Sequence, residues 1–282
     1  MMKRSCYRCG PAPLALSIKA YRTRIAATLF NGAMSPEQAQ GIGYLVSVPT
    51  LMAHLGHVVS LAHLSYVLAT AYHETACTMQ PIEEYGKGAG RPYGVPDPET
   101  GQTYYGRGFV QLTWRENYAK AATLCFNTHL EQGGVDLVLT PDMAMSPFVA
   151  TQITLFGMSQ GWFTGKRLSD YDRADGTFDY VNARRIINGT DRAEMVAGYA
   201  RQFEEAGRLA LGQRIVRDQV MVGSRGADVT ELQLLLGLPH DGVFGGATQE
   251  AVKGWQRAHG LQPDGVVGQL TWDALDAEEY GL

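Results

Sequence analysis

A short pattern occurs twice near the C-terminus, and it constrains the fold of that part of the chain strongly. The sequence DGVFG at 241–245 returns as DGVVG at 264–268, and Thr248 and Thr271 follow the two copies in step. Each copy predicts a tight Asp-Gly turn, followed by a threonine that can cap a helix. The repeat therefore predicts a small helical module over residues 224–282, after a linker over residues 212–223.

Residues 16–211 have the apolar spacing of helices, so we expect one mainly helical domain there, after an N-terminal tail of residues 1–15. Ser35 before Pro36 is a typical helix start. An irregular segment rich in glycine and proline, 86–108, interrupts the helical pattern and is expected to form a binding surface. Helices are expected over 16–30, from 35 to Pro49, and over 58–78, 110–126, 147–163 and 192–211.

Composition and charge exclude several classes of function. A net charge of -4 gives no electrostatic reason to expect nucleic acid or an anionic membrane as a partner. The chain contains no apolar run long enough to span a bilayer. Cys6 and Cys9 form only half of a zinc site, and no second pair follows at a useful spacing. We therefore expect neither a metal nor a cofactor.

The stretch AYHETACTMQPIEEYGKG at 71–88 concentrates carboxylates that could cleave a glycosidic bond. That reaction normally needs a protonated carboxyl group and an ionised one. In one straight helix Glu74 and Glu83 would be about 13 Å apart along the axis, more than the roughly 6.5–9.5 Å of an inverting enzyme. Pro81 is expected to end the helix, so that Glu83 or Glu84 can lie across a cleft from Glu74. The apolar helix before Glu74 favours its protonated form.

The C-terminal segment from about Arg225 to Leu275, which contains both repeats, resembles the small three-helix peptidoglycan-binding domain of bacterial and phage wall-lytic enzymes. The resemblance implies that the two turns bind the cell wall. The residues it points to are Asp241, Gly242, Asp264 and Gly265.

A second resemblance covers the region from about Phe30 to Gly207. The motifs AYHETACTMQPIEEYG, YYGRGFVQLTWRENY and RRIING are similar to those of glycoside hydrolase family 19, which includes chitinases and phage endolysins. This resemblance implies a lysozyme-like helical fold and cleavage of β-1,4 links with inversion. It makes Glu74 the general acid, and either Glu83 or Glu84 the general base, with Glu84 favoured. It also implies that Gln111 and Thr113 hold the attacking water and contact the sugar.

The same resemblance implies further substrate contacts, at Tyr105, Arg107, Asn117 and Asn188. These residue types suit a polysaccharide cleft, since amides and hydroxyls bind sugar edges and aromatic rings bind sugar faces. A plainer interpretation exists for two neighbours, because Trp114 and Tyr118 are four residues apart and could pack together into the core.

The same residues bear on three other classes of protein. A zinc peptidase is disfavoured, because His73-Glu74 begins like HExxH but Cys77 replaces the second histidine. A lytic transglycosylase would need Glu74 but no second carboxylate. A non-catalytic wall-binding protein would need none of the catalytic residues, so their presence disfavours it.

The favoured hypothesis is a monomeric endolysin that hydrolyses peptidoglycan glycan strands and uses the C-terminal module as an anchor. The start of the chain lacks a secretory pattern. We therefore expect the protein to stay in the host cytoplasm until a holin or similar protein opens the membrane, and then to act at the cell wall and in the periplasm.

Overall fold

A computed structural model describes residues 17–54, 59–124 and 135–281, without the side chains of residues 48–54 and 124. The described residues are mainly helical, which confirms the predicted fold class. They divide into two compact units, which we describe one at a time. Within the described residues, no helix is long and apolar enough to cross a membrane. Cys6, Cys9 and Cys125 lie outside the described residues.

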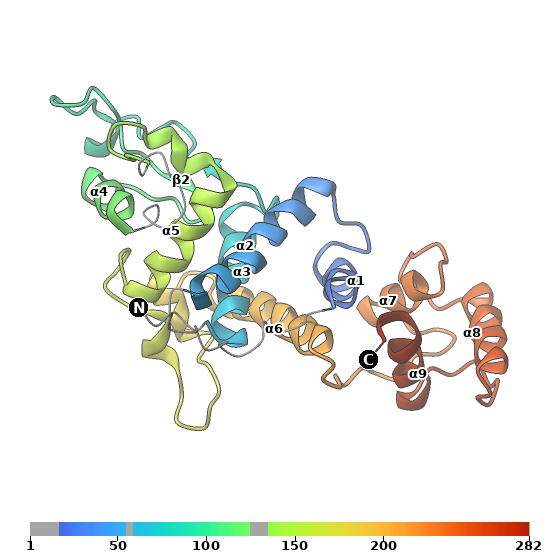
Figure 1. Cartoon of the computed structure of the whole chain (residues 1–282). Helices are drawn as coiled ribbons and strands as arrows, with labels where there is room; N and C mark the ends of the chain where they lie inside the picture. The colour runs from blue at the N-terminus through green and yellow to red at the C-terminus, as the bar shows by residue number, and fades with distance from the viewer. Residues whose placement is uncertain (1–16, 55–58, 125–134, 282) are drawn as a thin grey trace, which may run out of the picture. The chain divides into compact units, whose positions relative to one another are not determined.

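The larger unit contains residues 35–49 and 59–204. Helices α2 and α6 each continue from this unit into the smaller one. The elements of the larger unit are α2 (Pro36–His54), α3 (Leu61–Glu74), β1 (Ile82–Glu83), η1 (Pro92–Gly94), β2 (Arg107–Gly108), α4 (Arg115–Leu124), η2 (Pro141–Met145), α5 (Pro147–Gln160), η3 (Leu168–Tyr171), η4 (Asn182–Ile186) and α6 (Ala193–Ala210). Figure 1 labels the helices α2 to α6 and strand β2.

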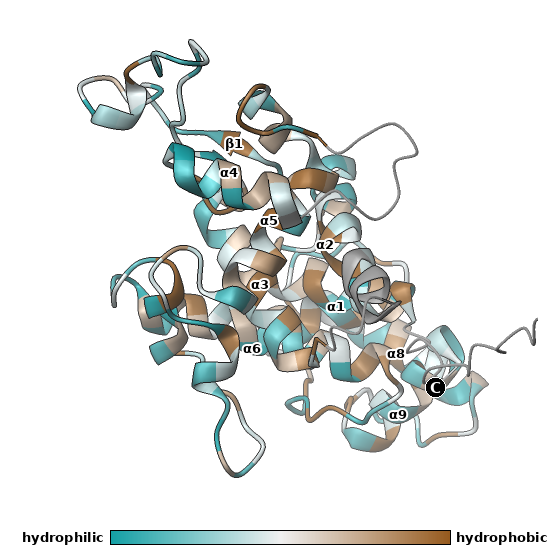
Figure 2. Cartoon of the chain, turned by 60° about the vertical axis from the view of Figure 1, so that its left-hand side comes forward, coloured by the Kyte–Doolittle hydropathy of each residue, from teal (hydrophilic) through white to brown (hydrophobic). Residues whose placement is uncertain are grey.

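Helices α3 and α5 form the centre of this unit. Every residue from Ser65 to Tyr72 in α3 is buried, and so is every residue from Val149 to Met158 in α5. Both helices have apolar residues along their length, as Figure 2 shows. A helix buried on all sides has neighbours all around it, so these two helices supply the rigid support for the polar segments that follow them.

Two predicted helix boundaries are wrong, and one is confirmed. The Ser35 hydroxyl accepts a bond from the Gln38 N–H at 3.2 Å, which confirms the predicted start of α2. Helix α2 does not end at Pro49 but runs to His54, since a proline weakens a helix without always ending it. Helix α3 already ends at Glu74, well before Pro81, because Ala76 and Cys77 adopt left-handed backbone conformations.

The smaller unit contains residues 17–34 and 205–281 among those described, together with 50–54. Its elements are α1 (Ile18–Leu29), the last turns of α6, α7 (Ala227–Leu235), α8 (Gly246–Ala258) and α9 (Gln269–Tyr280). Its core is apolar and completely buried, and consists of Val220, Val229, Leu232, Phe244, Val252, Val267, Trp272 and Leu275. Helices α7, α8 and α9 supply most of this core, as expected for a three-helix module.

A buried glutamine closes each Asp-Gly turn of the repeat. Gln233 donates to Asp241 Oδ1 at 2.8 Å and accepts from the N–H of the next residue, Gly242, at 2.9 Å. Gln256 makes the same two bonds in the second copy. The threonines do not cap the helices as predicted, because the caps are Gly245 and Gly268. Thr248 and Thr271 instead lie inside α8 and α9 and contact the two glutamines.

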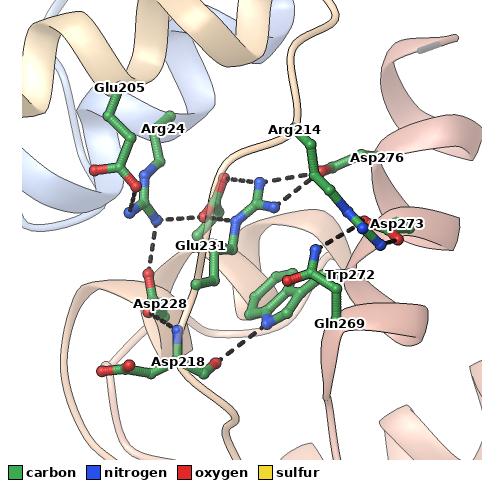
Figure 3. A network of polar contacts seen from close by, with 11 residues as sticks. Arg24, Glu205, Arg214, Asp218, Asp228, Glu231, Gln269, Trp272, Asp273 and Asp276 are labelled. Carbon is green, nitrogen blue, oxygen red and sulfur yellow. Dashed lines mark hydrogen bonds and ion pairs between the residues drawn. The ribbon is translucent and has the colours of Figure 1, made fainter.

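A network of buried charges connects α1 to the C-terminal helices (Figure 3). The Arg24 guanidinium contacts carboxylates of Glu205, Asp228 and Glu231, at 3.0, 2.7 and 2.6 Å. On the other side of Glu231, Arg217 binds both of its oxygens. Compactness thus groups α1 with residues 205–281, whereas the sequence places it in the catalytic domain. The predicted domain boundaries themselves stay a prediction.

Candidate active site

The short ladder of β1 and β2 brings Glu83 into a group of donors. The two strands are antiparallel and pair Glu83 with Arg107. The Tyr105 hydroxyl donates to Glu83 Oε1 at 2.7 Å, and the Lys87 ammonium lies 2.8 Å from Oε2. The hydrogen bonds from Lys87 and then from Tyr105 lower the pKa of Glu83. Glu83 is therefore an ionised carboxylate. Its side chain is 32% exposed, so an outside molecule can reach it.

Glu84 binds different partners, and they belong to the protein framework. Its Oε1 accepts from the Tyr93 hydroxyl at 2.9 Å, and its Oε2 accepts from the Gly106 N–H at 3.1 Å. The Glu84 N–H in turn donates to the Gly106 carbonyl at 2.7 Å. These contacts tie the end of β1 to the segment before β2, so Glu84 supports the local structure around Glu83.

Arg107 holds Tyr105 from within the protein. Its side chain is only 3% exposed, and its guanidinium carbon lies 3.6 Å from the centre of the Tyr105 ring. It also donates to the Tyr118 hydroxyl at 3.1 Å and pairs with Asp142 at 3.0 Å. These contacts orient the tyrosine that binds Glu83. A direct contact of Arg107 with substrate stays a prediction.

The segment 111–114 departs from ordinary backbone geometry. Gln111 and Trp114 have φ angles of 57° and 77°, a left-handed conformation that costs bulky residues free energy. Gln111 Nε2 donates to the carbonyl of Ile82 at 3.1 Å, and Thr113 Oγ1 donates to the carbonyl of Gln111 at 2.8 Å. The first bond attaches the segment to β1 at the residue before Glu83, and the second lies within the segment.

Trp114 does not pack into the core, so the interpretation of Trp114 and Tyr118 as a core pair is wrong for Trp114. Its side chain is 47% exposed, and it lies edge to face with Tyr93, ring centres 5.1 Å apart. Tyr118 is fully buried, as that interpretation expects. Asn117 Nδ2 donates to the carbonyl of Thr113 at 2.9 Å, which holds its amide against the backbone of segment 111–114.

Glu74 belongs to a separate ion pair. The buried Arg184 donates from Nη1 to Glu74 Oε1 at 2.6 Å and from Nε to the carbonyl of Asp191 at 2.9 Å. The pair fixes the Glu74 carboxyl at the end of α3. Asn188 lies four residues after Arg184; its N–H binds the Arg184 carbonyl at 2.9 Å, and the residue is exposed.

The contacts thus assemble most of the predicted site residues around β1 and β2, including Glu83, Glu84, Tyr105, Gln111 and Thr113. Glu74 and Asn188 instead share contacts with Arg184. No local pattern in the sequence pairs Arg184 with Glu74, since 110 residues separate the two. Gln233 and Gln256 were missed altogether, although each lies eight residues before a repeated aspartate.

The described residues contain no group of three or more histidine, cysteine, aspartate or glutamate side chains that could hold a metal ion. Asp241 and Asp264 each accept bonds from a buried glutamine and from a backbone N–H two residues on, so both have a role in holding their turns. Contact of these turns with the cell wall stays a prediction.

Comparison with known proteins supports the identity of the C-terminal module. The family model described as "Putative peptidoglycan binding domain" matches residues 225–275, within the range predicted for such a domain. A curated relative, an uncharacterized protein in the bpoA1 3' region of Kitasatospora aureofaciens, is 56% identical over 36 residues. That match covers 13% of this chain and spans 30% of the relative's length.

Among solved structures, the chain is similar to chitinases. A bacterial family 19 chitinase is 19% identical with a TM-score of 0.39, over 71% of this chain and 88% of the other. Chitinase C from Streptomyces griseus is 20% identical with a TM-score of 0.44, over 74% of this chain and 99% of the other. Identities and TM-scores this low carry no argument about the activity of this chain.

Proposed function

We propose that this chain is a glycoside hydrolase that cleaves β-1,4 bonds in bacterial peptidoglycan. The observation that carries the proposal is the environment of Glu83, an accessible carboxylate that Lys87 and Tyr105 keep ionised. Beside it, the strained Gln111 and Trp114 offer an amide and an exposed ring. An ionised carboxylate next to hydroxyl, amide and aromatic groups suits general-base hydrolysis of a sugar polymer.

In this proposal Glu74 is the general acid and Glu83 is the general base. Arg184 donates to Oε1 of Glu74, and the other oxygen of that carboxyl carries the proton that goes to the leaving oxygen of the sugar. Glu83 takes a proton from the attacking water, which Thr113 and Gln111 position. The contacts of Glu84 favour a supporting role for it, so we assign the general base to Glu83 rather than to Glu84.

The C-terminal module anchors the enzyme to its polymeric substrate. Its family match names peptidoglycan, and wall binding raises the local concentration of glycan near the catalytic residues. Deleting residues beyond 223 should therefore reduce lysis of whole walls more than cleavage of a small soluble glycan.

Mass spectrometry of the fragments released from purified peptidoglycan tests the reaction class. A hydrolase leaves ordinary reducing ends on the glycan and intact peptides. Fragments one water lighter, with an anhydro ring, would make the protein a lytic transglycosylase and remove Glu83 from the mechanism. Cut peptides on intact glycan would overturn the proposal, since a peptidase or amidase would then be at work.

Single substitutions test the roles of the carboxylates. Glu74→Gln and Glu83→Gln should each reduce the rate of cleavage by about 10²-fold or more, since each removes a proton-transfer group. Glu84→Gln should cost less, and the exposed Glu116→Gln serves as the matched control. A fully active Glu83→Gln with an inactive Glu84→Gln would return the base to Glu84.

The biological role within this proposal is lysis of a host cell. The enzyme would accumulate in the host cytoplasm and reach the wall, as a monomer, when a holin-like partner opens the membrane. Expression in a susceptible bacterium with and without a co-expressed holin tests that route. Lysis that begins equally early in both cultures would contradict it.

A further inference from the structure

An open cavity of about 550 Å³ lies in the smaller unit, between the end of α1 and the first Asp-Gly turn. Three segments line it: residues of α1 with the turn that follows, residues at the start of α7, and residues 240–243. The exposed polar side chains of Asn31, Arg225 and His240 belong to this lining. The proposed catalytic chemistry uses none of them.

The second repeat shows why the first one has room for a cavity. Long side chains cover the glycine of the second turn: a Cβ added at Gly265 would lie 2.8 Å from Gln249 Cγ and 3.1 Å from Lys253 Cε. The residues at the same two places of the first repeat are Gly226 and Thr230, both small. Thr230 Oγ1 still lies 2.9 Å from a Cβ added at Gly242, but Gly226 has no side chain, so the first turn is covered by fewer atoms than the second.

The charges around the cavity have both signs. Arg225 is exposed, and its charge interacts with that of Asp241 in the lining of the same cavity. Asp241 uses Oδ1 for its bonds with Gln233 and the Val243 N–H, and the residue is exposed, so an outside partner can reach its carboxylate. No tyrosine, tryptophan or phenylalanine is among the described lining residues, although aromatic rings are the usual partners of sugar faces.

We propose that this cavity binds the stem peptide of peptidoglycan, with Arg225 on a peptide carboxylate and Asp241 on an amino group. Stem peptides carry free carboxylates and free amines, which match the two charges better than a neutral sugar does. The inference rests on the proposed wall binding and deepens it. It also brings in Asn31, which lies outside the matched range of 225–275 and thus makes the N-terminal helix part of the anchor.

Titration of the full-length protein with a synthetic stem tetrapeptide, followed by NMR, tests the proposal, with the peptide-free disaccharide as the comparison ligand. Arg225→Gln should weaken peptide binding about tenfold, because a charge-assisted pair is lost. Asn31→Gly keeps the left-handed backbone (φ 51°) and removes the amide, so it should weaken binding about threefold. The exposed Arg257→Gln on α8 is the matched control and should bind as the wild type does.

The outcomes separate this inference from the proposed function. If the wild type sediments with purified walls but does not bind the tetrapeptide, wall binding stands and the peptide site is wrong. Equal binding by Arg225→Gln and the wild type, or tighter binding of the disaccharide, would also overturn it. If the wild type does not sediment with walls at all, the proposed anchor fails, and this inference fails with it.

Discussion

At the scale of single residues, the site contains groups held in conformations that folding alone does not favour. Trp114 combines a left-handed backbone with an exposed ring, two costs that a purely structural residue avoids. The Trp114 ring lies next to Tyr93, whose hydroxyl binds Glu84. Binding of a sugar face by this ring would compensate for the strained backbone and for the exposed apolar surface.

Trp114→Gly should therefore weaken substrate binding without unfolding the protein. Glycine relieves the backbone strain, by about 1 kcal/mol, while the sugar loses its stacking partner. We expect a KM for a small soluble peptidoglycan glycan that is about tenfold higher, and a thermal midpoint that is unchanged or higher. The control is Leu270→Ala, another exposed apolar residue. A lower midpoint with an unchanged KM would contradict this interpretation of Trp114.

Tyr105 sets the pH range in which Glu83 is ionised. Its hydroxyl is the second donor to Glu83 after Lys87, and both lower the pKa of that carboxyl. Tyr105→Phe removes a bond that favours the ionised form, so the pKa of Glu83 rises. The acid limb of the profile of kcat/KM against pH should then move to higher pH. Tyr104→Phe is the control, since that hydroxyl binds the Val138 carbonyl instead. An acid limb that stays in place would remove Glu83 as the base.

At the scale of elements, local signals predicted some helix ends and missed others. The bonds of Ser35 involve residues three apart, so the sequence alone could place that cap. The end of α3 could not be predicted in this way. Pro81 was the stronger local signal, but the chain leaves the helix at Glu74, where the buried Arg184 binds the carboxyl from far along the sequence.

The glutamine that closes each Asp-Gly turn should contribute to the stability of the repeat. Gln233→Leu removes the acceptor for the Gly242 N–H and the donor to Asp241, and it leaves polar groups unpaired. We expect a loss of about 2–3 kcal/mol in the free energy of unfolding of the smaller unit, measured with urea. Gln256→Leu should cost about as much, since its bonds are the same.

The exposed Gln262→Leu is the matched control for both substitutions. It should change the unfolding free energy by no more than about 0.5 kcal/mol. If all three variants unfold at the same urea concentration as the wild type, the glutamines do not hold the turns.

At the scale of the whole chain, the contacts of α1 lie far from it in the sequence. Residues 16–211 share one helical pattern, which predicts one domain over that range, and these bounds stay a prediction. The polar partners of Arg24 in α1 are about 200 residues away, since it binds Asp228 and Glu231 in α7. A periodic pattern predicts that a helix has a buried face, but it does not say what covers that face.

Arg24→Met should thus destabilise the C-terminal unit, although the substitution lies near the other end of the chain. Glu231 is fully buried, and without Arg24 the one cation left to pair with it among the described residues is Arg217. Removing one partner of a buried ion pair lowers the free energy of unfolding by about 3–5 kcal/mol. The matched control is the exposed Arg22→Met on the same helix, which should lower it by no more than about 0.5 kcal/mol. Urea unfolding reports the difference through the fluorescence of Trp272, which lies in the core of that unit. Adding Glu231→Leu to Arg24→Met removes the uncompensated carboxylate and should recover part of the loss. If Arg24→Met unfolds like Arg22→Met, α1 is not a structural part of the anchor.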